Sequence, residues 1–266
     1  MIETKTSSPR TSTRTVHGTA TPFRCPSCRV GALLTWGRSL GAACDGLARP
    51  ACWSLQCGYC AEMFRMHDGG IPDLLRAVGD EEAVAHQAEH FDEAVDPEFE
   101  IERPRGAGAL YQALIESKFR RGIAALPFPL AGTTVLDVCC GSGMGAEAYA
   151  ARGAVVTGVD VSLEALRRAH ERARRRSFGF EAVLADAGNL PFLDRTFDVV
   201  VVHDGLHHLP CPALGIDEMA RVARRAVVVI EPAASPITRW AVHHGLAAEV
   251  EECGNRIHRF GPGEVE

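Results

Sequence analysis

The chain has 266 residues, of which 46% are hydrophobic and 23% are charged, and its formal net charge is −6 at pH 7. These fractions are typical of a globular protein with one large core or two modest ones. The acidic balance argues against nucleic-acid binding, which relies on a basic excess. No stretch reaches the ~18 consecutive apolar residues of a membrane-spanning helix.

Residues 1–20 are rich in Thr, Ser and Arg and contain no apolar segment of the kind found in secretory signals. We expect a disordered tail and a cytoplasmic protein, with a transit peptide as the weaker alternative. Disulfides are then improbable, so the ten cysteines need another explanation.

Four of the first six cysteines form two Cys-x-x-Cys pairs, Cys25/Cys28 and Cys57/Cys60. Four thiolates from two such turns make a closed tetrahedral site that suits structural zinc. We therefore predict a zinc-ribbon domain at residues 21–75, with a redox pair or an empty site as the alternatives.

The two pairs are separated by roughly 28 residues, more than the ~15–20 that are usual in a ribbon. The insert contains Cys44 and Cys52, and either can replace one of the four ligands. The ligand set is therefore open at these two positions.

Charge changes sharply after the ribbon. Residues 1–66 carry a balance of roughly +5, whereas residues 67–104 carry roughly −10. An acidic segment repels phosphates, so a nucleic-acid contact would have to come from the basic N-terminal part alone. We expect residues 76–104 to be a solvated acidic linker that leads to a second domain at residues 105–266.

Two helices are expected in the second domain. Residues 106–126 show helical periodicity, and Pro127 ends the pattern. Ser162 can cap a helix at residues 163–175, whose arginine-rich end we expect to be a solvated face. The apolar stripe of the first helix consists of Leu110, Leu114, Ile115, Phe119 and Ile123.

Between these helices, an apolar run at residues 135–138 leads into a turn with Gly141 and Gly143, and then into a segment of helical composition. Such a turn lets a ligand approach the backbone and presents the unpaired N–H groups of a helix N-terminus. Taken alone it is a weak signal, since many nucleotide binders and structural turns share it.

Three further apolar runs end in polar residues, namely Asp160, Asp186 and His203. Asp160 lies roughly 20 positions after the Gly-rich turn, where a ribose-binding carboxylate is expected. Because open parallel sheets bind ligands at the carboxyl ends of their strands, these residues predict one cofactor site.

The motifs VLDVCCGSG, VVTGVD, LADAGNLPF and FDVVVVHDGLHHL, in this order and spacing, resemble class I S-adenosylmethionine-dependent methyltransferases. The branch with ubiquinone/menaquinone C-methyltransferases is the most similar, and the likeness covers roughly residues 105–232. It implies an α/β fold with a Rossmann-like, doubly wound and mostly parallel sheet. It also implies a cofactor-binding set: Asp137, Gly141, Ser142 and Gly143 for methionine and ribose, Asp160 and Val161 for ribose, Asp186 and Ala187 for adenine, His203 below the sulfonium, and Tyr111, which can equally be a packing residue.

The chain departs from this family at Cys139, where the family usually has glycine. A thiol fits there if the backbone keeps φ below zero, so we expect a modest effect on cofactor binding.

The Gly-rich turn can alternatively belong to a dinucleotide-binding domain for NAD. Its fingerprint is Gly-x-Gly-x-x-Gly, whereas this chain has Gly141-x-Gly143-x-Gly145. The NAD reading also leaves LADAGNLPF without a role, so S-adenosylmethionine is the preferred cofactor.

The cysteine-rich segment has its own resemblance. FRCPSC, LQCGYC and the following MHDGGIPDLL are similar to the zinc ribbon that precedes some methyltransferases, including bacterial ribosomal-RNA guanine-N1 enzymes. A ribosomal-RNA base methyltransferase is therefore one alternative function.

The C-terminal part predicts a fifth strand near residues 225–230 and a helix at residues 237–252. The family ordinarily adds two more strands, and no strand-like run follows here. A Val-rich strand at an open sheet edge promotes association. We expect the C-terminal strands to be missing and the chain to self-associate through the fifth strand, unless that helix or a partner covers it.

The sequence thus predicts methyl transfer from S-adenosylmethionine to an unidentified acceptor, more in keeping with a small molecule than with nucleic acid. The sulfonium methyl is already activated, so positioning and desolvation are the main contributions of the protein. His207 or His208 can take a proton from the acceptor, or both can simply pack. The alternative from another class is a catalytically inert cofactor-binding module whose ribbon recruits a partner.

Overall fold

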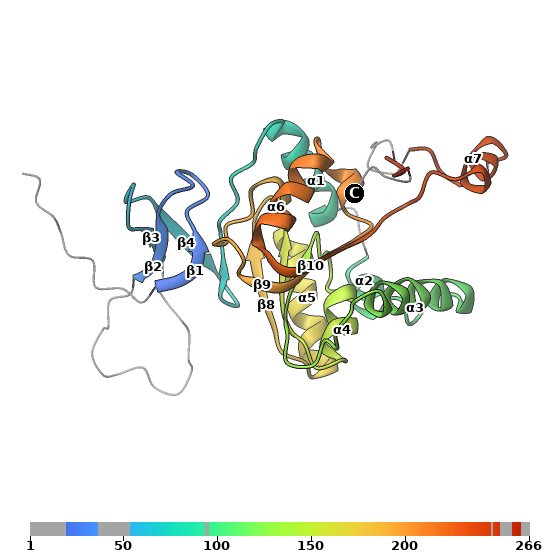
Figure 1. The fold of residues 1–266 in the computed structure, drawn as a ribbon, viewed down its shortest axis with the longest axis horizontal. Coiled ribbons are helices and arrows are strands. Elements are labelled where there is room, and N and C mark those ends of the chain that lie inside the picture. The colour runs from blue at the N-terminus through green and yellow to red at the C-terminus, as the bar shows by residue number, and fades with distance from the viewer. Residues whose placement is uncertain (1–19, 37–53, 94–95, 246, 251–256, 262–266) are drawn as a thin grey trace, which may run out of the picture.

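The computed structural model describes residues 20–36, 54–93, 96–245, 247–250 and 257–261 (Figure 1). These residues form a small antiparallel sheet and a larger parallel sheet. Residues 1–19 of the predicted tail, and Cys44 and Cys52 of the insert, lie outside the described residues. No helix in the described ranges is long and apolar enough to span a membrane.

The small sheet is a meander in which each strand pairs with the next one in sequence. Cys25 and Cys28 lie in the turn after its first strand, and Cys57 and Cys60 lie at the turn after its third. Alternate turns of a meander lie at the same end of the sheet, so the two pairs meet there. The strands are β1 (Ala20–Arg24), β2 (Ala32–Trp36), β3 (Ser54–Cys57), β4 (Met63–His67) and β5 (Ile71–Pro72).

The large sheet is parallel throughout, with the strand order β10-β9-β6-β7-β8. This order confirms the Rossmann-like α/β sheet, and it reverses at β6, where such sheets open a ligand-binding crevice. The strands are β6 (Thr134–Val138), β7 (Val155–Asp160), β8 (Phe180–Leu184), β9 (Phe197–His203) and β10 (Ala223–Ile230).

Helices and the ribbon cover the two faces of this sheet, which is why β6 and β9 are almost continuously apolar. The first face carries α3 (Ala109–Ala124), α4 (Met144–Ala150) and α5 (Leu163–Arg176). The second face carries α6 (Pro212–Val222) and the small sheet. Between β8 and β9 the chain makes only the 3₁₀ turn η1 (Ala187–Asn189).

The ribbon packs directly on the edge of the large sheet next to β8. The Leu74 N–H donates to Leu184 O at 2.9 Å, and Asp73 bridges to the same residue in parallel register. On the other side of the ribbon, the rings of Phe23 and Phe192 lie 5.5 Å apart. Ribbon and large sheet therefore share one hydrophobic core.

The acidic segment is not the solvated linker that we expected. It forms α1 (Glu81–Glu93) and α2 (Pro97–Glu102), both of which contact α5. Val84 and Gln87 of α1 and Glu100 and Ile101 of α2 are buried. The segment is folded and not solvated because these helices make apolar and polar contacts with the second domain.

Arginines of α5 hold α1 and α2 in place, so its arginine-rich end is solvated only in part, as at Arg174, which is 73% exposed. Arg168 donates from Nη2 to Phe91 O at 2.7 Å, and Arg172 donates from Nη2 to Glu100 O at 2.6 Å. Further along α5, Arg175 forms an ion pair with Glu98 at 2.6 Å. The acidic helices and the basic helix neutralise each other across this contact.

The C-terminal helix α7 (Pro236–His243) is shorter than predicted and extends away from the sheet (Figure 1). Gly245, with φ of +69°, follows its end. Ile237 is 77% exposed and Trp240 is 56% exposed, so α7 does not shield β10. Phe260 lies beside the residues that follow β10, and its N–H donates to Pro232 O at 3.0 Å.

The outer edge of β10 has no strand partner among the described residues, and Val227 on it is 36% exposed. We propose that two copies associate through this edge, because its free N–H and C=O groups invite strand pairing. Light scattering should show a mass that rises with concentration, and Val227→Lys should suppress the rise. Val155→Lys, at a 63% exposed position in the inner strand β7, is the matched control. A concentration-independent monomer with slow amide exchange across residues 227–230 would contradict the proposal.

Candidate cofactor pocket and metal centre

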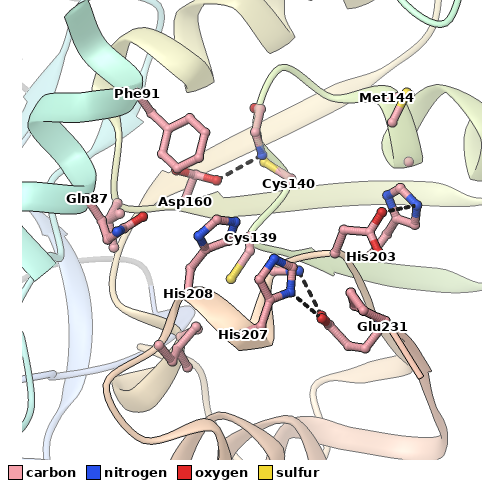
Figure 2. Close-up of a pocket in the computed structure, with 18 of the residues that line it drawn as sticks. Gln87, Phe91, Cys139, Cys140, Met144, Asp160, His203, His207, His208 and Glu231 are labelled. Atoms are coloured by element: carbon pink, nitrogen blue, oxygen red, sulfur yellow. Dashed lines mark hydrogen bonds and ion pairs between the residues drawn. The ribbon is translucent and has the colours of Figure 1, made fainter. Parts of the chain in front are cut away.

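A cavity of about 850 Å³ lies at the carboxyl ends of β6, β7, β9 and β10. The helix α1 covers the cavity, and Figure 2 shows its Gln87 and Phe91 next to His208, whose ring lies 5.6 Å from that of Phe91. All the residues predicted to bind the cofactor line this cavity except Gly143: Tyr111, Asp137, Gly141, Ser142, Asp160, Val161, Asp186, Ala187 and His203. Gly143 instead packs against α5, where a Cβ would lie 3.0 Å from Ala169 Cβ.

The Gly-rich turn between β6 and α4 is left-handed at several positions. Gly141 has φ of +51° and Gly143 has φ of +78°, which glycine adopts without penalty. Cys139 also has a positive φ, +52°. We expected a modest effect of Cys139 on cofactor binding only for a negative φ, so this expectation does not hold. A side chain in this region costs about 1–2 kcal/mol. Burial, with repulsion from Asp160, raises the pKa of the Cys139 thiol well above its ordinary value, so the thiol is neutral.

Asp160 closes the turn through its carboxylate. Oδ2 accepts from Gly141 N–H at 2.8 Å, and Oδ1 accepts from Ser162 N–H at 3.0 Å. Burial raises the pKa of this carboxyl, although backbone N–H groups favour the charged form. Each carboxylate oxygen has a second lone pair, so the group can still accept from two ribose hydroxyls.

Asp137 lies one strand away and has an unusual pKa. Its carboxyl is 2% exposed, and its Oδ2 has no hydrogen-bond partner within the described residues. Burial raises its pKa to about 7, with a further contribution from Asp160. Gly145 permits this burial, because a Cβ there would lie 2.8 Å from Asp137 Oδ2. An orphaned carboxylate on a cavity wall suits a cationic ligand group.

Asp186 and Ser142 are both held by the segment that was expected to be a linker. Asp186 Oδ2 accepts from Val78 N–H at 2.9 Å. The Ser142 hydroxyl donates to Glu100 Oε2 and accepts from Arg168 Nε, each at 3.2 Å. The acidic segment thus positions two residues of the cavity wall.

His203 forms the part of the wall next to α3. Its ring lies 4.7 Å from the ring of Phe119, and burial lowers its pKa to about 4. Although Nε2 is 3.2 Å from Asp204 Oδ2, the imidazole is therefore neutral near pH 7. A neutral ring suits a place beside a sulfonium, because a charged one would repel it.

His207 and His208 lie together at the end of β9, and their ring centroids are 4.3 Å apart (Figure 2). His207 Nδ1 is 2.6 Å from Glu231 Oε2, and both side chains are 2% exposed. The other oxygen of Glu231 accepts from the N–H groups of Gly205 and Leu206, each at 2.7 Å. One carboxylate therefore orients both the imidazole and the turn that carries it.

Sequence reasoning did not indicate Glu231, Gln87 or Phe91 as part of the cavity wall. Glu231 follows the fifth strand directly, and this position at a strand end was the available signal. Gln87 and Phe91 had no comparable signal, since they lie in a helix within an acidic segment.

The four cysteine sulfurs of the ribbon lie within 4.8 Å of one another. Cys25 Sγ is 3.8 Å from Cys60 Sγ, and Cys28 Sγ is 3.6 Å from Cys57 Sγ. A tetrahedral zinc with Zn–S bonds of ~2.3 Å separates its sulfurs by ~3.8 Å, so the geometry fits this metal. At Gly31 a Cβ would lie 2.4 Å from Cys57 Sγ, so only glycine fits beside the cluster.

Residues 135–226 match the family model described as Methyltransferase domain. A demethylmenaquinone methyltransferase of Clavibacter sepedonicus is 39% identical over 114 residues, which cover 41% of this chain and 45% of that protein. A ubiquinone biosynthesis O-methyltransferase of Thiobacillus denitrificans is 42% identical over 100 residues, which cover 36% and 42%. The chain thus spans less than half the length of these relatives.

Among solved structures, the magnesium protoporphyrin IX methyltransferase ChlM of Synechocystis PCC 6803 with bound SAH aligns with a TM-score of 0.51. The two chains are 20% identical, and the alignment covers 69% of this chain and 85% of that one. This likeness concerns the fold. The family match, these relatives and the strand order identify residues 135–226 as a methyltransferase domain of the class I, S-adenosylmethionine-dependent type, preceded by a four-cysteine ribbon.

Proposed function

We propose that the chain transfers a methyl group from S-adenosylmethionine to a small, largely apolar acceptor. The observation that carries this proposal is a shared cavity. Asp137, Asp160 and Asp186, from the ends of three strands, line the same space as the paired His207 and Glu231.

The cofactor half of the cavity fits both charges of the methionine moiety. Asp137 offers an unpartnered carboxylate oxygen to the ammonium group. Arg103 lines the same cavity, and its buried Nε has no hydrogen-bond partner in the part of the chain that is described. Its guanidinium can bind the carboxylate, for which its planar donor geometry is suited.

When bound, S-adenosylmethionine supplies an activated methyl group. The chain supplies the environment. Glu231 accepts from His207 Nδ1–H and so orients the imidazole, which is the first candidate to take a proton from the acceptor. His208 is the second candidate for this role because its ring lies against that of His207 and faces α1. The roof formed by α1 excludes water from the reaction.

The far half of the cavity is apolar, which supports an apolar acceptor. Its walls come from the turn after His208 and from the C-terminal segment: Leu209, Pro210, Pro232, Ala233, Ala248, Val250 and Ile257. The two relatives are named for demethylmenaquinone and for ubiquinone biosynthesis, which is consistent with this chemistry. The net charge of −6 gives no support to a nucleic-acid acceptor.

Transfer of labelled methyl groups tests the proposed function. We expect label in one or more members of a panel of hydroquinones, phenols and other hydroxylated aromatics, and none in ribosomal RNA or tRNA. Label in RNA alone would overturn the small-molecule assignment, and cofactor binding without label in either panel would favour an inert module.

Asp160→Ala should weaken binding of S-adenosylhomocysteine (SAH), the demethylated product of the cofactor. Hydrogen bonds to a charged group contribute about 1.5–3 kcal/mol, so we expect the Kd to rise about 10- to 150-fold. Calorimetry measures the change, and circular dichroism checks that the turn around Gly141 still folds. Asp217→Ala, an exposed carboxylate on α6, should leave the Kd unchanged. An unchanged Kd in Asp160→Ala would show that this carboxylate does not hold the ribose.

Binding of SAH should weaken as the pH falls. The pKa of Asp137 is about 7 in the free protein, and a cationic ammonium group favours the ionised carboxyl. Below pH 7 this carboxyl must therefore lose a proton on binding, and the Kd at pH 6 should be about tenfold higher than at pH 8. Calorimetry in buffers of different ionisation enthalpy detects the released proton. Asp137→Asn should bind more weakly but with a flat pH dependence, and a pH-independent wild type would refute the role of Asp137.

A further inference from the structure

Asn189 joins the ribbon to the turn after β8 without lining the cavity itself. Its side chain is 2% exposed and makes three hydrogen bonds to the N-terminal part of the chain. Nδ2 donates to Pro26 O at 3.1 Å and to Arg76 O at 3.0 Å, and Oδ1 accepts from Arg29 Nε at 3.0 Å. Because a buried amide is costly unless it is paired, these partners fix its position.

The partners of Asn189 are themselves positioned by the cysteine pairs. Pro26 lies inside the first pair, and Arg29 follows it directly. Arg76 donates to Glu62 Oε1 at 2.7 Å, and Glu62 comes shortly after the second pair. Both metal-binding turns therefore converge on one side chain of the methyltransferase domain.

On its other side, Asn189 closes the turn that carries the proposed adenine site. Its N–H donates to Asp186 O at 2.9 Å, and Asp186 Oδ1 accepts from Gly188 N–H at 2.8 Å. Asp186 and Ala187 line the cavity. A shift of Asn189 would therefore move the backbone and the carboxylate that face the adenine.

We propose that metal binding by the ribbon sets the affinity of the cavity for the adenine end of the cofactor, with Asn189 as the positioning residue. This inference rests on the proposed binding of S-adenosylmethionine. Loss of the metal releases the two cysteine turns, so Pro26 and Arg29 no longer hold Asn189 and the turn at residues 186–189 loosens. Among the described residues, no hydrogen bond joins the cysteine turns to the ends of β6 and β7, the proposed sites of the methionine and ribose.

Two ligands separate the adenine contribution from the rest. SAH carries the adenine amino group, and S-inosylhomocysteine carries an oxo group in its place. With the zinc-loaded full chain we expect clear preference for SAH. After chelation the Kd of SAH should rise about tenfold or more while that of the inosine analogue changes little, and added zinc should restore the preference. Equal SAH affinity with and without zinc would overturn the proposal.

Substitution of Asn189 tests the same coupling with the metal in place. Asn189→Asp puts an acceptor opposite Pro26 O and Arg76 O, and Asn189→Ala removes all three bonds. Both variants should keep one zinc per chain and lose most of the preference for SAH over the inosine analogue. The matched control is Arg24→Gln, which breaks the 3.2 Å contact to Glu218 elsewhere in the interface.

The outcomes distinguish this inference from the function on which it rests. If the zinc-loaded wild type binds neither ligand, the proposed cofactor is wrong. If it binds SAH but both Asn189 variants retain the wild-type preference, only the coupling is wrong. An equal loss of affinity for SAH and for the inosine analogue, in a variant with the circular dichroism spectrum of the wild type, would also refute a specific effect on adenine.

Discussion

The double substitution Cys25→Ser, Cys28→Ser should abolish zinc binding and unfold the ribbon. The sulfur separations of 3.6 and 3.8 Å match a tetrahedral zinc site, and structural zinc contributes about 10–16 kcal/mol to the folding of zinc-finger peptides. Metal analysis of protein purified without chelators should give about one zinc per chain in the wild type and none in the variant. Hydrogen exchange should locate the unfolding in residues 20–36 and 54–72.

Cys211→Ser provides the control, because Cys211 is an exposed free cysteine far from the ribbon in sequence. It should retain the zinc of the wild type. Zinc retained by the double variant would move the ligands to Cys44 and Cys52, and a wild type without zinc would contradict the metal centre altogether.

Arg172→Met should lower the free energy of unfolding by about 2–6 kcal/mol, because it leaves two buried carbonyl oxygens without a donor at about 1–3 kcal/mol each. The Arg172 side chain is fully buried and pairs with Glu147 at 3.0 Å. It also donates to Ser142 O at 2.7 Å and to Glu100 O at 2.6 Å, which ties the Gly-rich turn to α2. Methionine fills much of the volume but leaves these acceptors without a donor.

Urea unfolding measures this effect, and Arg174→Met is the matched control on the same helix. The Arg174 side chain is 73% exposed and pairs only with Glu171 among the described residues, so its loss should cost no more than about 0.5 kcal/mol. Equal stability of the two variants would show that the clamp between α5 and α2 does not contribute to folding.

The strands of the large sheet could be predicted because each is a local pattern. An apolar run that contains Asp137 or that is followed by Asp160, Asp186 or His203 needs no knowledge of distant residues. The same is true of the Cys-x-x-Cys pairs. Local patterns also place functional side chains at strand ends, and the topology of a parallel sheet then brings those ends together.

The packing of the acidic segment could not be predicted, because it depends on partners roughly 70 to 80 residues away in the chain. Charge counting shows only that acidic and basic segments exist. Whether they are solvated or paired is decided by the fold. For the same reason the sequence did not indicate that α1 forms the roof of the cavity.

The backbone conformation of the turn and the exposure of helix faces could not be predicted from the sequence either. The φ of +52° at Cys139 is opposite in sign to the φ that a modest effect on cofactor binding requires, and local composition does not fix the φ of a turn residue. In α3, Ile115 and Phe119 are buried as the periodicity predicts, whereas Leu110 at the start of the same stripe is 86% exposed. Periodicity identifies a face but not how much of it finds a partner.

Calorimetric titration of the zinc-loaded full chain with SAH and, separately, with NAD tests the central claim most directly. The cavity presents Asp137, Asp160 and Asp186 at three successive strand ends, and a pyrophosphate would meet these carboxylates unfavourably. We predict saturable one-to-one binding of SAH with a Kd in the micromolar range and no heat from NAD. Micromolar binding of NAD with no signal from SAH would contradict the assignment of this cavity to S-adenosylmethionine.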